Sequence, residues 1–245
     1  KFLNHITRQD IWYDALRFAD ASGENLDYEI DTWDPSGESL VWVSVPSLSG
    51  TATKFSAHFA PDADYALPDV FPTSVWTKAD YIGVWHFGET TGSSFSDSTG
   101  HGLTAVPTTA FTYMGTDGPV GGYQSSASGC FVDDIWSFLE SSRTNFSGEA
   151  WINLNGKTSN QEIFSDGASW NDMHARFPVR ADGGRAYLYG GPNLTATKGG
   201  YEQLASLATT SWMHLVVQYG LDGSAYVLQN GSSYLASGKS RAETA

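Results

Sequence analysis

A glycine-rich turn at residues 97–102, DSTGHG, has the residue types of a cation site. Asp97 opens the turn with a carboxylate, and Gly100 and Gly102 free the backbone to direct carbonyl oxygens inward. Calcium prefers carboxylate and carbonyl oxygens at about 2.3 to 2.6 Å. We therefore expect Asp97, Gly100 and Gly102 to form a calcium site. The alternative is an Asx turn, in which Asp97 only accepts hydrogen bonds from nearby backbone amides.

A second group of side chains has the composition of a sugar-binding surface. Exposed aromatic rings stack on the C–H faces of sugars, and polar groups beside them bind the hydroxyls. The candidates for ligand binding are Trp170, Asn171, Asp172, Arg176, Arg180, Tyr187, Tyr189 and Tyr201. Because 14% of the residues are aromatic, many other rings must simply fill the core.

The elements that position these side chains are expected to be β-strands. Short alternating runs separated by Gly, Asp, Asn, Ser and Pro are typical of antiparallel structure. In the first third we expect strands at 15–18, 27–33, 40–45 and 53–59. Residues 60–74 carry three prolines, which cannot donate a regular ladder of hydrogen bonds. This composition indicates a linker, and we place the domain boundary within it.

The second part is also expected to be built from strands. They are predicted from Tyr81 onward and at 149–154, 162–164, 174–179, 185–189 and 212–219. Asp222-Gly223 and Asn230-Gly231 supply the positive φ angles that tight hairpin turns require. Residues 133–140 are the one stretch that indicates a short helix, since they begin with acidic residues.

The order of several motifs in residues 81–236 resembles the laminin-G-like branch of the concanavalin A-like lectins and glucanases. The motifs are VWHFGE at 84–89, DSTGHG at 97–102, GEAWI at 148–152 and WMHLVVQY at 212–219. The resemblance implies a jelly roll, which is an antiparallel β-sandwich that holds glycans more often than it cuts them, and often calcium at the second motif. It also implies that Trp85, Trp151 and Trp212 pack in the core.

Residues 14–59 resemble an uncharacterised bacterial domain family. The motifs are LRFAD at 16–20, LDYEIDTW at 26–33 and VWVSVP at 41–46. Members often precede laminin-G-like modules in surface and envelope proteins, including extracytoplasmic parts of TolQ/ExbB-type proton-channel proteins. This resemblance implies an extracellular, cell-surface or periplasmic location. We expect the chain to be a segment of a longer envelope protein, whose other domains are candidate partners and whose sequence beyond Ala245 supplies the closing strand of the jelly roll.

Residues 29–34, EIDTWD, approximate the E-x-D-x-x-E signature of laminarinase-like glycoside hydrolases. A strand puts Glu29 and Asp31 on one face, and a bulge could return Asp34 to it. Retaining hydrolysis needs two carboxyl groups about 5 to 5.5 Å apart, one with a raised pKa. Asp34 is shorter than glutamate and precedes Pro35, however, so a strand that ends in a β-turn is the favoured interpretation.

Composition and charge exclude several classes of function. Lys plus Arg number 13 against 27 for Asp plus Glu, and the net charge of -14 repels nucleic acid and anionic membrane surfaces. No apolar run approaches the roughly 20 residues that span a bilayer, so we expect no direct membrane insertion within this segment. The six histidines lack the paired spacing of zinc ligands, and no nucleotide-binding or nucleophile-elbow motif occurs.

The sequence thus predicts an all-β chain, with a small N-terminal β domain and linker over 1–74 and a laminin-G-like jelly roll over 75–245. We expect a lectin-like module that binds a glycan or glycoprotein without catalysis, with calcium as the candidate cofactor. Two alternatives stay open. One is a glycoside hydrolase using Glu29, Asp31 and Asp34, and the other is a structural or protein-interaction spacer.

Overall fold

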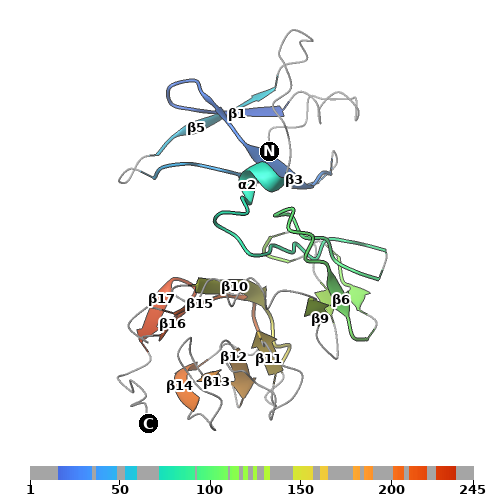
Figure 1. Ribbon diagram of the computed structural model, residues 1–245, viewed down its shortest axis with the longest axis vertical. Helices are drawn as coiled ribbons and strands as arrows, with labels where there is room; N and C mark the ends of the chain where they lie inside the picture. Colours follow the sequence, from blue (N-terminus) through green and yellow to red (C-terminus); the bar gives the residue numbers. More distant parts are fainter. Residues whose placement is uncertain are drawn as a thin grey trace. The chain divides into compact units, whose positions relative to one another are not determined.

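The computed structural model consists mostly of short antiparallel strands, with one four-residue helix in the described part of the chain (Figure 1). The structure describes residues 16–34, 37–48, 53–59, 72–91, 93–109, 111–115, 118–120, 124–125, 130–132, 146–156, 161–164, 179–182, 185–189, 201–206, 210–219 and 225–235. Within these ranges no helix has the length and apolar character needed to cross a membrane. The all-β class expected from the sequence agrees with this content of strands.

Contacts between Cα atoms group the chain into two compact units, Lys1–Ile135 and Trp136–Ala245. They are termed unit 1 and unit 2 below. The domain boundary suggested at residue 74 stays a prediction. In the structure, the segment that follows that residue contacts the N-terminal strands within unit 1, for example through His86 and Glu29.

Unit 1 begins with two small antiparallel sheets. Their strands are β1 Leu16–Asp20, β2 Asn25–Leu26, β3 Tyr28–Thr32, β4 Leu40–Val43 and β5 Phe55–Phe59. The first sheet has the order β2-β1-β5, and β3 pairs with β4 in the second. Each of the four strands expected in this region is therefore present. The helix α2, Pro72–Val75, lies against β3 and ends the segment that was expected to be a linker (Figure 1).

The core of this region forms around four buried side chains of β1, β2 and β3. They are Leu16, Phe18, Leu26 and Tyr28, and partly buried residues in β3 and β4 or just after them pack against this group. The Phe18 and Tyr28 rings meet edge to face, with centroids 5.2 Å apart. The Tyr28 hydroxyl donates a 2.5 Å hydrogen bond to the Leu16 carbonyl, so this deeply buried phenol keeps a partner.

The rest of unit 1 contains two short strand pairs. β6 Ala105–Pro107 pairs with β9 Cys130–Val132, and β7 Thr112–Tyr113 pairs with β8 Gln124–Ser125.

The strand expected from Tyr81 onward is wrong, because residues 81–88 form no strand. Phe87 lies in this segment and cannot be part of a strand. Its φ of 58° is left-handed, which an extended strand does not allow, and its ring is held by Phe95 with centroids 4.9 Å apart.

Unit 2 contains two four-stranded antiparallel sheets. One has the order β10-β15-β16-β17 and the other has the order β11-β12-β13-β14. The strands are β10 Phe146–Ile152, β11 Gln161–Phe164, β12 Val179–Asp182, β13 Arg185–Tyr189, β14 Tyr201–Ser206, β15 Met213–Tyr219, β16 Ala225–Gln229 and β17 Ser232–Leu235. The helix expected at 133–140, and most of the strand expected at 174–179, lie outside the described residues.

The strand β15 shows why its sequence folds in this way. Met213, Leu215 and Val217 are fully buried, whereas the alternate residues between them are partly exposed. This period of two is that of a strand with one face on the core. The predicted turn at Asn230-Gly231 is confirmed, since both residues have positive φ, 49° and 79°, between β16 and β17.

Candidate functional site

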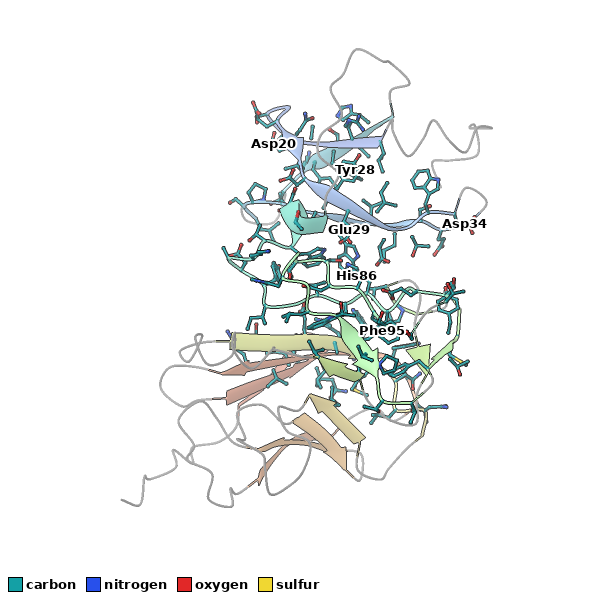
Figure 2. All side chains as sticks on the ribbon, turned by 45° about the vertical axis from the view of Figure 1, so that its right-hand side comes forward. Asp20, Tyr28, Glu29, Asp34, His86 and Phe95 are labelled. Carbon is teal, nitrogen blue, oxygen red and sulfur yellow. The ribbon has the colours of Figure 1, made fainter. Side chains whose placement is uncertain are left out.

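The most elaborate polar arrangement described in unit 1 is a buried cluster of Glu29, Asp31 and His86. Figure 2 labels two of its members, Glu29 and His86. The His86 Nε2 lies 3.0 Å from Glu29 Oε2, and its Nδ1 lies 3.6 Å from Asp31 Oδ2. The side chains are only 9%, 6% and 15% exposed for Glu29, Asp31 and His86. The imidazole therefore bridges both carboxylates of β3 from the segment that follows Tyr81.

Further donors and rings enclose this cluster. The Trp76 indole donates a hydrogen bond to Glu29, and the Ser98 hydroxyl donates a second one at 2.9 Å. The Trp42 indole donates to Asp31 at 2.9 Å. Trp42 also stacks on the His86 ring, with centroids 5.4 Å apart and planes at 22°. Residues from β3, from β4 and from 76–98 thus meet at one buried polar centre.

The cluster shifts the pKa values of its three groups. Burial favours neutral Glu29, but hydrogen bonds from His86, Trp76 and Ser98 outweigh it, so the pKa of Glu29 lies below its ordinary value. For Asp31 burial dominates and raises the pKa. Burial also works against charged His86, yet the Glu29 bond and the charges of Asp31, Glu29 and Glu89 raise its pKa. The arrangement therefore favours an ionised Glu29 beside an imidazolium.

The raised pKa of His86 predicts a loss of stability at alkaline pH. A group whose pKa is higher in the folded chain stabilises the fold fully below its unfolded pKa, which is 6.5 for histidine. That contribution is lost as the pH rises through the folded value. The lowered pKa of Glu29 matters at acidic pH. Its contribution to stability is present above the unfolded pKa of 4.5 and is lost as the pH falls through the pKa of the folded chain. Thermal unfolding from about pH 6 to about pH 9 should show a falling midpoint.

The control for this pH series uses a second histidine. His58 lies exposed on β5, so His58→Gln should keep the fall in the unfolding midpoint. His86→Gln should flatten it, because the titrating imidazole is gone. An equal slope in both variants would show that His86 does not set the alkaline pH dependence.

The carboxylates proposed for hydrolysis are only partly brought together. Glu29 and Asp31 share a face as predicted, and the register shift between Ile30 and Thr32 places a bulge at Asp31. Asp34, in contrast, is exposed and accepts a 3.3 Å hydrogen bond from the Gly37 amide through its carbonyl. A hydrogen bond from the fourth residue to the first agrees with the β-turn of the favoured interpretation. The carboxylates of Glu29 and Asp31 are both buried and both accept hydrogen bonds from indoles. This environment suits a structural centre better than a catalytic pair that hydrolyses a glycosidic bond.

The turn at residues 97–102 has Asp97 at its centre. Asp97 Oδ1 accepts from the amides of Val84 at 3.1 Å and Thr99 at 3.0 Å, and Oδ2 accepts from the amides of Gly102 and Leu103 at 3.2 and 3.3 Å. Burial opposes the charge, but these bonds and the Thr99 hydroxyl lower the pKa of Asp97.

This geometry is the Asx turn that was the alternative to a cation site. Gly100 and Gly102 have the positive φ values, 77° and 80°, that the turn requires. No group of metal-binding side chains is found among the described residues. Calcium at Asp97, Gly100 and Gly102 stays a prediction, which melting curves with and without calcium test directly.

The predicted sugar-binding residues divide into two groups. Trp170, Asn171, Asp172 and Arg176 lie outside the described residues. Arg180, Tyr187, Tyr189 and Tyr201 lie on β12, β13 and β14, where Arg180 pairs with Tyr187 and Tyr189 pairs with Tyr201. Residues directly opposite each other in an antiparallel pair share a face, as do residues two apart along a strand. The register therefore brings these four residues to one face of the sheet.

The expectation that Trp151 packs in the core is wrong. This residue, on β10, is 40% exposed, and its ring lies 5.1 Å from that of His214 on β15. Trp85 and Trp212 are partly buried, and the Trp85 indole donates to the Leu103 carbonyl at 2.6 Å. Alternation along β10 and β15 could have identified Trp151, because it shares a face with His214 and Glu149 rather than with buried Leu215.

Comparison with protein-family models, with curated proteins and with solved structures gave no match to this chain. The laminin-G-like resemblance and the resemblance of residues 14–59 therefore stay predictions from sequence motifs.

Proposed function

We propose that this chain is a non-catalytic carbohydrate-binding module of a bacterial surface or envelope protein, and that unit 2 closes as a concanavalin A-like jelly roll. The observation that carries the proposal is the shared sheet face of Arg180, Tyr187, Tyr189 and Tyr201. Aromatic side chains bring large, rigid contact area at small entropic cost, and a guanidinium offers several donors to hydroxyl groups.

The spacing of these residues supports a short saccharide as the ligand. Tyr187 and Tyr189 are two residues apart on β13, or roughly 6.6 Å along the strand. Arg180 and Tyr201 lie opposite them on the two neighbouring strands, so the surface is three strands wide. Binding through ring stacking and a few hydrogen bonds gains little beyond the cost of ordering the ligand, and we expect dissociation constants from micromolar to millimolar, about -4 to -8 kcal/mol.

The same sheet face also carries polar neighbours for the sugar hydroxyls. Glu162 on β11 pairs with Arg180, and Gln203 on β14 pairs with Tyr187. Both share the face of the four predicted residues by register. A carboxylate, an amide and a guanidinium around aromatic residues are the mixture that orients a hydroxylated ligand. The net charge of -14 disfavours polyanionic glycans, so a neutral polysaccharide is the preferred class.

The test of this function is binding to a panel of neutral polysaccharides by glycan array, followed by titration of the best ligand. We expect the double variant Tyr187→Ala/Tyr189→Ala to weaken binding at least about tenfold, which is about 1.4 kcal/mol. Two stacking surfaces are lost in it, whereas a change far from that sheet should have no effect.

Tyr113→Ala is the matched control, since it makes the same change on β7 of unit 1. It should bind as the unchanged protein does. Absence of binding across the whole panel would refute the proposal, and so would full affinity in the double variant. Incubation with β-glucans tests the hydrolase alternative in the same samples. Release of reducing ends that stops in Glu29→Gln, while the circular dichroism of the variant equals that of the unchanged protein, would favour catalysis instead.

A further inference from the structure

The outer face of the β10-β15 pair carries a second constellation of side chains suited to a ligand. Trp151 is 40% exposed and lies directly opposite His214. The two rings are 5.1 Å apart between centroids, with an angle of 31° between their planes. Single exposed aromatic residues are common on protein surfaces. Here, however, the imidazole of the neighbouring strand lies against the indole, and this contact favours the observed orientation of the ring.

A carboxylate completes the constellation. Glu149 lies two residues before Trp151 on the same face of β10, and its Oε2 is 3.4 Å from His214 Nε2. The Glu149 side chain is 64% exposed, so its second oxygen remains available to a ligand. The indole and the carboxylate stand roughly 6.6 Å apart along the strand, which is the scale of one sugar ring and its substituent.

The backbone beneath these side chains is fixed. The His214 amide donates to Asn230 Oδ1 at 2.9 Å, and the Asn230 amide donates to the His214 carbonyl at 2.9 Å. On the opposite face of the same strand, Leu215 is fully buried in the core. The surface therefore sits on a strand whose backbone is hydrogen-bonded to its neighbour, so binding a ligand requires little ordering of the backbone.

We propose that Glu149, Trp151 and His214 bind a protonated amino sugar. The sugar ring stacks on the Trp151 indole, and the ammonium group lies between the indole face and the Glu149 carboxylate. Both groups attract a cation, the first through its π-system and the second through its charge. The net charge of -14 further favours a cationic ligand over a neutral or anionic one. This site lies on the β10-β15-β16-β17 sheet and does not depend on the β11-β14 surface proposed above.

The test uses a β-1,4-linked glucosamine tetramer and its fully N-acetylated counterpart, titrated by calorimetry at mildly acidic pH, where the free amines are protonated. We expect the glucosamine tetramer to bind more tightly, because acetylation removes the positive charge and leaves the ring. Trp151→Ala should weaken its binding about tenfold or more, and Trp151→Phe should recover part of it. Glu149→Gln should weaken it about three- to fivefold and leave the acetylated tetramer unaffected.

Two controls separate this inference from the proposed function. Glu38→Gln removes the same charge from an exposed position in unit 1 and should bind both tetramers as the unchanged protein does. Tyr187→Ala/Tyr189→Ala should keep full affinity for the glucosamine tetramer. Equal affinity for the two tetramers, unchanged binding in Trp151→Ala, or loss of glucosamine binding in the double tyrosine variant would each overturn the proposal.

Discussion

Glu29→Leu is expected to lower the free energy of unfolding by about 3 to 5 kcal/mol, the range found when one partner of a buried ion pair is removed. The change leaves the His86 ring, the Trp76 indole and the Ser98 hydroxyl without the Glu29 oxygen atoms to which they are hydrogen-bonded. Buried donors that lose their acceptor retain the full cost of desolvation. Urea unfolding followed by tryptophan fluorescence measures the loss, since Trp42 and Trp76 belong to the same cluster.

Glu38→Leu is the control for this prediction. Glu38 is exposed, so the identical change there should alter the free energy of unfolding by no more than about 0.5 kcal/mol. Glu29→Gln should fall between the two, because an amide keeps one acceptor for the indole and loses the charge that faces His86. A loss below about 1 kcal/mol for Glu29→Leu would mean that the cluster does not hold unit 1 together.

Leu215→Ala is expected to destabilise unit 2 by about 2 to 5 kcal/mol. Leu215 lies on β15, the strand that pairs with both β10 and β16, and its side chain is fully buried. Truncation removes apolar contacts and leaves a cavity that a well-packed sheet fills only in part. The measurement is the shift of the urea unfolding midpoint at constant slope.

A matched pair on the same strand gives the control. Val217 is fully buried and Val216, its neighbour, is only partly so. Val217→Ala should therefore cost clearly more than Val216→Ala, which is expected to cost less than about 1 kcal/mol. Equal losses at the two positions would contradict the assignment of opposite faces to them.

Local patterns were enough to predict much of the strand content. The alternation of apolar and polar residues identified β3 and β15, and a short run of β-branched and aromatic residues identified β4. The dipeptide Asn230-Gly231 identified a hairpin turn through the φ angles it permits. These features depend on residues close together in the chain. Hydrophobic period and turn chemistry therefore determine them before any tertiary contact is known.

The features that sequence reasoning missed depend on contacts between distant residues. His86 lies 57 positions from Glu29, and neither its type nor its spacing indicates the bridge between the two carboxylates. The segment around Phe87 is aromatic and alternating, which favours a strand, yet packing on Phe95 outweighs that preference and leaves Phe87 at positive φ. The family resemblance implies that Trp151 packs in the core, whereas its register opposite His214 places it on the face away from buried Leu215.

The central claim is tested most directly by the NMR signals of individual tyrosine rings during titration with a glycan. Ring-labelled tyrosine, assigned by single Tyr→Phe changes, allows each ring to be followed by NMR while the best neutral ligand is added. We predict that the signals of Tyr187, Tyr189 and Tyr201 shift in parallel with saturation, while buried Tyr28 of unit 1 does not move. Saturable binding that leaves those three signals unchanged would contradict the proposed carbohydrate-binding face.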